Sequence, residues 1–122
     1  MITLAATTHS LEVKLDGAVT TNELPIVTAY VDIPATAGVP TGFSPGAGTT
    51  ATNGATAVSA IAAPAAATTR QVKFVSVYNA DTVNAIATLQ FNDNGTKRII
   101  AKRELLPGDT LAYIDSVGFQ IS

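Results

Sequence analysis

The C-terminal half of the sequence alternates between apolar and polar residues in short runs that turn-forming residues separate. These runs lie at 71–79, 85–92, 97–105, 110–114 and 117–121. Alternation with a period of two residues predicts strands that bury one face, and no stretch shows the 3.6-residue period of an amphipathic helix. This half of the chain therefore restricts the fold to the all-β class.

Three turn signals connect these predicted strands. Asn94-Gly95 is typical of a two-residue hairpin turn, because both residues tolerate the positive φ angles that this turn requires. Pro107-Gly108 suits the central positions of a type II turn. We expect a third turn at 79–82, so that the strands on either side of it pair as a hairpin and the five strands form a meander.

The N-terminal half predicts two or three further strands. Residues 24–33 are rich in β-branched and aromatic side chains, residues 57–62 form a second apolar run, and 11–15 alternates. The total of seven or eight strands predicts an antiparallel β-sandwich or a jelly-roll-like fold. The alanine run at 63–67 contains Pro64, which opposes a helix there.

The length of 122 residues predicts a single domain, 1–122. Within it, residues 1–24 form either an edge strand of the domain or an N-terminal arm that pairs with a neighbouring subunit. Residues 34–56 carry no charge and consist mainly of Ala, Thr, Gly and Pro. We interpret 34–56 as a long loop that is either exposed to solvent or laid on a partner.

The composition excludes several classes of function. Charged residues make up only 13% of the chain, the net charge is -2 and cysteine is absent. There is accordingly no basic field for nucleic acid, no disulfide framework and no thiolate metal site. No apolar run approaches the roughly 18 residues of a membrane span, and the N-terminus lacks the pattern of a secretory signal, which favours a cytoplasmic product.

The sequence contains no recognisable catalytic group. His9 is the single histidine, and no second histidine or cysteine completes a metal shell or a nucleophilic pair. Most carboxylates stand at predicted turns, where hydrogen bonds to the local backbone explain them. Asp93-Asn94-Gly95 lacks the spacing and the closing glutamate of a calcium loop. We therefore expect neither an enzyme nor a cofactor, a metal or a small-molecule substrate.

A sparsely charged surface favours association with other protein subunits. Isolated apolar residues in uncharged segments are cheap to desolvate, and the arginines of the two basic pairs on 97–105 offer either a subunit contact or a solvated strand face. The candidate interface residues are Leu11, Val13, Leu24, Pro25, Val39, Phe43, Pro45, Arg98 and Arg103.

Three turn motifs in the C-terminal half carry a resemblance to a known group of proteins. They are Tyr78-Asn79-Ala80-Asp81-Thr82, Asn92-Asp93-Asn94-Gly95-Thr96 and Pro107-Gly108-Asp109-Thr110. The series resembles the pattern of small virion proteins of tailed bacteriophages. The resemblance implies a capsid decoration (cement) protein that is made in the host cytoplasm, binds the major capsid protein on the outer capsid surface and forms a dimer or trimer.

Two other functions stay open from the sequence. A neck, tail or fibre-associated virion protein would have nearly the same pattern. A carbohydrate-binding β-sandwich belongs to a different class, and it is disfavoured because sugar platforms present exposed aromatic rings whereas this chain has few.

Overall fold

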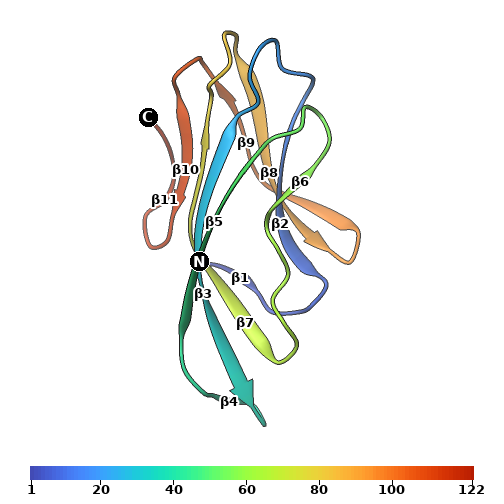
Figure 1. Cartoon of the computed structure of the whole chain (residues 1–122), viewed down its shortest axis with the longest axis vertical. Coiled ribbons are helices and arrows are strands. Elements are labelled where there is room, and N and C mark those ends of the chain that lie inside the picture. Colours follow the sequence, from blue (N-terminus) through green and yellow to red (C-terminus); the bar gives the residue numbers. More distant parts are fainter.

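The computed structural model describes all residues from Met1 to Ser122 as eleven strands without a helix (Figure 1). The strands are β1 (Ile2–Leu4), β2 (His9–Leu15), β3 (Pro25–Thr36), β4 (Val39–Pro40), β5 (Ser44–Ala51), β6 (Val58–Ile61), β7 (Thr68–Tyr78), β8 (Ala85–Asp93), β9 (Thr96–Leu105), β10 (Thr110–Ile114) and β11 (Gly118–Ile121). The all-β class is confirmed, and the expected seven or eight strands are too few.

The strands form two antiparallel sheets, which we call sheet A and sheet B. Sheet A has seven strands: β11, β10, β7 and β3 follow one another, β5 and β4 pair with β3, and β1 pairs with β7. Along β7, β10 pairs with residues 74–78 and β1 with residues 70–72. Sheet B has four strands in the order β6, β2, β8, β9.

The two sheets share one hydrophobic core. A single cluster of 16 buried residues contains Val13 and Leu89 from sheet B together with Ile26 and Val77 from sheet A. In β2 the apolar residues alternate with Glu12 and Lys14, so one face of the strand points into the core. The two sheets therefore face each other across a common core, whereas a jelly-roll-like strand order stays a prediction.

The expected hairpin between 71–79 and 85–92 is wrong, and so is the expected meander. β7 belongs to sheet A and β8 to sheet B, so residues 79–84 cross from one sheet to the other. The chain crosses back between β9 and β10. Alternation shows which residues of a strand point into the core, but it does not show to which of the two facing sheets the strand belongs.

The other two predicted turns are confirmed. β8 and β9 pair around Asn94 and Gly95, which have φ angles of 49° and 93°. At the second turn Gly108 has a φ of 90°, and the Asp109 N–H donates to the Leu106 carbonyl at 2.9 Å. Strand β6 and the absence of a helix at 63–67 also agree with expectation.

The segment 1–24 is folded into the domain and is not an arm, and only its short strand β1 lies at a sheet edge. β2 lies between β6 and β8 in the interior of sheet B, and β1 pairs with β7 in sheet A. Leu4 and Leu24 are fully buried. These two leucines are part of the core of this chain, so the segment is folded into the domain.

The segment 34–56 is largely strand, and its interpretation as a loop is wrong. β3 continues to Thr36, turns at Ala37 and Gly38, and returns as β4 and β5. Packing explains why a glycine stands at position 46 of β5. A Cβ atom on Gly46 would lie 2.5 Å from the Tyr30 ring, so only glycine lets that ring cross the strand.

Candidate interaction surface

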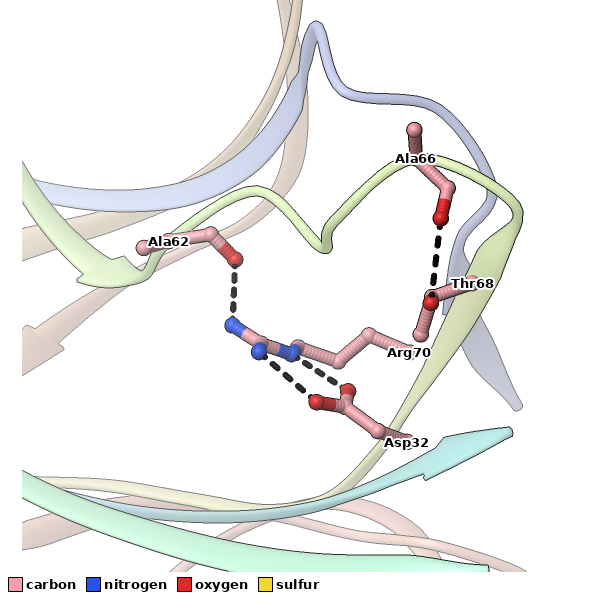
Figure 2. A network of polar contacts seen from close by, with 5 residues as sticks. All are labelled: Asp32, Ala62, Ala66, Thr68 and Arg70. Atoms are coloured by element: carbon pink, nitrogen blue, oxygen red, sulfur yellow. Dashed lines mark hydrogen bonds and ion pairs between the residues drawn. The ribbon is translucent and has the colours of Figure 1, made fainter. Parts of the chain in front are cut away.

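The two charged residues that flank the charge-free segment form an ion pair with each other. Asp32 and Arg70 are the charged residues that flank residues 33–69, and they stand opposite each other on β3 and β7. Figure 2 shows the fork that they form: Arg70 Nε donates to Asp32 Oδ1 at 2.7 Å and an Nη donates to Oδ2 at 2.9 Å. Hydrogen bonding from Arg70 holds the pKa of Asp32 below its ordinary value.

Two more contacts fix the Arg70 side chain. Its second Nη donates to the Ala62 carbonyl at 2.9 Å, and its guanidinium lies 4.0 Å from the centre of the Tyr30 ring (Figure 2 shows the first). The ring in turn covers Gly46. These contacts connect β3, β5, β7 and the segment after β6. Asp32 and Arg70 are the last charged residues on β3 and β7 before the hairpin that lies beyond them.

Beyond this ion pair, residues 33–43 form a projecting hairpin. Figure 1 shows the end of β3 with β4 and the start of β7 reaching past sheet B. The hairpin carries no charge, and its most exposed apolar side chains are Val39 at 64% and Phe43 at 76% of their full surface. Exposed apolar groups on a projecting element are a feature of protein contact sites.

The outer face of sheet A, which we call the uncharged face, continues from this hairpin. In β3, Ile26 and Thr28 are buried whereas Val27 is 43% exposed, so the odd-numbered residues of its first half point outward. Register places Ser76 beside Val27 and Phe74 beside Ala29, and Ile114 of β10 lies beside Phe74. None of these outward residues is charged. Lys73, in the β7 bulge, is paired with Asp115 at 3.0 Å.

The outer face of sheet B, which we call the charged face, has the opposite character. Glu12, Lys14, Lys97, Lys102 and Glu104 lie on it, with Ile99 as its exposed apolar residue. Lys97 Nζ is 2.7 Å from Glu12 Oε1. Burial opposes ionisation of Glu12, but hydrogen bonds from Lys97 and Gln90 outweigh it and hold the pKa of Glu12 below its usual value.

The nine predicted interface residues fall into four places. Leu11, Val13 and Leu24 are 0% exposed, so their expected contact with a partner is wrong: their side chains form the core. Val39 and Phe43 lie on the projecting hairpin, and Pro45 follows it in β5. Pro25 is exposed at the other end of β3, and Arg98 and Arg103 are exposed on β9.

Sequence reasoning missed the uncharged face. Its signal was the run Ile26-Val27-Thr28-Ala29-Tyr30-Val31-Asp32-Ile33, which has apolar residues at both odd and even positions. A strand with that pattern is expected to be covered on both faces, whereas a strand exposed on one face alternates. Here the protein's own core covers one face, and nothing in the chain covers the other.

The side chains of His9 and Asp81 both form hydrogen bonds within the protein. His9 Nδ1 accepts the Ala5 N–H at 3.1 Å, and its ring meets Phe91 edge-on at 4.9 Å between centres. Asp81 accepts four backbone N–H groups, those of Thr20, Thr21, Asn22 and Thr82, at 2.8–3.2 Å. These bonds, with that from Thr20 the largest, lower the pKa of Asp81 to about 2 although burial acts against them.

Exposed aromatic rings do not gather on this protein. Phe43 and Tyr78 are the exposed aromatic side chains, and pairing along β3 places them at opposite ends of that strand. Eight or so residues of strand separate them by more than about 20 Å. The two rings cannot serve as one stacking platform for a sugar.

The side chains present no group of three or more His, Cys, Asp or Glu residues that could hold a metal ion. The structure also has no helix that is long and apolar enough to cross a membrane. Comparison with protein-family models, with curated proteins and with solved structures found no match to this chain.

Proposed function

We propose that this protein is a β-sandwich subunit of a bacteriophage virion, namely a decoration protein that binds the outer surface of the major capsid protein. The contrast between its two outer faces carries the proposal. One face carries only Lys73, which is paired with Asp115, and the hairpin that continues this face has no charge, while the other face carries Glu12, Lys14, Lys97, Lys102 and Glu104. The resemblance of the turn motifs to those of small virion proteins is the reason for choosing the major capsid protein as the partner.

The physical argument rests on desolvation. Covering a charged side chain with protein is costly unless the charge finds a partner, whereas the uncharged face presents apolar and neutral polar side chains apart from Lys73, whose charge is already paired with Asp115. The uncharged face and the projecting hairpin therefore lie against capsid subunits, and the charged face remains in water. Many copies on a regular lattice turn a weak contact per copy into strong total attachment, which is how a small protein can stabilise a capsid.

The test compares two single lysine substitutions at exposed β-branched positions. Val27→Lys puts a charge on the uncharged face, and Ile99→Lys puts the same charge on the charged face, where the side chain is 63% exposed. Both proteins should fold with unchanged circular dichroism. In particles assembled from the genome that encodes this chain, Val27→Lys should be lost from the virion while Ile99→Lys is retained.

Copy number and position decide between the virion roles. A cryo-electron-microscopy reconstruction that shows the wild-type chain in many copies on the outer capsid supports decoration. A few copies at the neck, tail or fibres would support the alternative virion role instead. Absence from purified particles, or equal incorporation of both lysine variants, would refute the proposed function.

A further inference from the structure

Six strands lie at the open edges of the two sheets, namely β1, β4, β5 and β11 in sheet A and β6 and β9 in sheet B, and all but one of them are short or charged. β9 is lined by Lys97, Arg98, Lys102 and Arg103, and such charges oppose the approach of a second strand. β1, β4, β6 and β11 are only two to four residues long. β5 differs from all of these, because it is eight residues long and carries no charge.

The register identifies which backbone groups of β5 are free. Pro25 and Pro45 lack an N–H, and they stand opposite Ala51 and Val31, so these are non-hydrogen-bonded pairs of the β3–β5 ladder. The residue just after β5 is consistent with this register, because the Thr52 N–H points toward β3 and donates to the Leu24 carbonyl at 3.0 Å. Alternation then directs the N–H and C=O groups of Ala47, Thr49 and Ala51 away from β3, and no other strand pairs with β5.

Side chains leave this edge accessible. Ala47, Thr49 and Ala51 are small, exposed and on the same side as the uncharged face. Pro45 removes one donor at the start of the strand and thus limits the free edge to the following residues. The edge is a row of unpaired hydrogen-bonding groups with nothing charged beside it.

We propose that β5 pairs with β5 of a second copy of this chain, antiparallel and about a two-fold axis at Thr49. Thr49 then stands opposite Thr49 of the second copy, and Ala47 stands opposite Ala51 of the second copy. Each of these pairs exchanges two N–H···O bonds. Sheet A would run through both copies, and the two uncharged faces would become one continuous surface.

The absence of charge argues for a second copy as the occupant. A two-fold contact pairs a strand with the same strand of the second copy, so an edge lined mainly by charges of one sign meets like charges across the axis. β9 fails this condition with its lysines and arginines, whereas β5 meets it along its whole length. The inference concerns the isolated protein, so it stands or falls separately from the proposed virion function.

The first experiment introduces opposite charges at the two-fold axis. Sedimentation of the wild-type protein over a range of concentrations should show a monomer–dimer equilibrium. Thr49→Lys and Thr49→Asp should each weaken dimerisation at least tenfold, because like charges would then face each other. An equimolar mixture of the two variants should restore the dimer. The control is Ser59→Lys, which puts a charge on edge strand β6 and should leave the dimer intact.

The second experiment checks the register by covalent capture. The chain has no cysteine, so Thr49→Cys introduces a single thiol. Directly opposed residues of a hydrogen-bonded pair have Cα atoms about 5.5 Å apart, within the range that a disulfide spans. Under mild oxidation Thr49→Cys should form a covalent dimer much faster than Ser59→Cys. A wild-type protein that stays monomeric, or equal cross-linking of the two variants, would overturn the proposal.

Discussion

Asn79 should be a principal determinant of stability at the link where the chain crosses from sheet A to sheet B. Its side chain is 1% exposed. Nδ2 donates to the carbonyls of Leu105 at 2.8 Å and Val83 at 3.0 Å, and Oδ1 accepts the Asp81 N–H at 2.9 Å. Asn79→Ala removes all three bonds while the backbone bonds of residue 79 can remain.

The magnitude follows from which partners stay buried. The Leu105 carbonyl and the Asp81 N–H lose partners in buried bonds, whereas Val83 is exposed and its carbonyl can bind water. Each buried group left unpaired costs about 1–2 kcal/mol, so Asn79→Ala should lower the free energy of unfolding by about 2–4 kcal/mol. For a domain of this size that corresponds to a decrease in Tm of roughly 8–16 °C.

Urea denaturation followed by circular dichroism measures this free energy directly. The matched control is Asn84→Ala, an exposed asparagine on the same link, which should change stability by less than about 0.5 kcal/mol. Asn79→Asp keeps the shape and the acceptor for the Asp81 N–H but has no donor for the Leu105 carbonyl at neutral pH. A loss below about 1 kcal/mol for Asn79→Ala, or wild-type stability for Asn79→Asp, would refute the reasoning.

Three further predictions concern single sites. Gly46→Ala should destabilise the protein by about 1–3 kcal/mol, since a Cβ there would meet the Tyr30 ring at 2.5 Å, whereas Gly17→Ala, with open space at its Cβ, should be neutral in the same thermal melts. Gly95→Val should lower Tm because Gly95 has a φ of 93°, and an unchanged Tm would contradict the strain argument. Asp81 has a pKa lowered to about 2, so its contribution to stability is complete above about pH 4 and is lost as pH falls through 2. Acid denaturation of Asp81→Asn should accordingly depend less on pH over that range.

Local sequence signals identified the strands well and identified their partners poorly. The alternation at 85–92 and 97–105, with Asn94-Gly95 between them, specifies a hairpin whose partners are close in sequence, and it is confirmed. The same alternation at 71–79 and 85–92 suggested another hairpin, but those strands lie in different sheets. The cross-over at 79–84 is held by Asn79 and Asp81, whose bonding partners include Leu105 and Thr20, which are far away in the sequence.

The candidate surface shows the same division. Phe43 and Val39 were identified as exposed contact residues because they are isolated apolar residues in an uncharged segment, and both are exposed. Leu11, Val13 and Leu24 have the same apolar character but are buried. Hydrophobicity by itself cannot distinguish a residue that packs in its own core from one that would pack on a partner.

The sequence by itself determined the all-β class, the positions of most strands and two of the turns, because alternation and positive-φ residues act over a few neighbours. Only the tertiary structure decided which strands form each sheet, that residues 34–56 return as β4 and β5, and that one outer face has almost no charge. These features depend on pairs such as Asp32 with Arg70 and Tyr30 with Gly46, which strand pairing brings together across the sheet. Their energy comes from contacts between distant segments, and a local pattern does not contain that information.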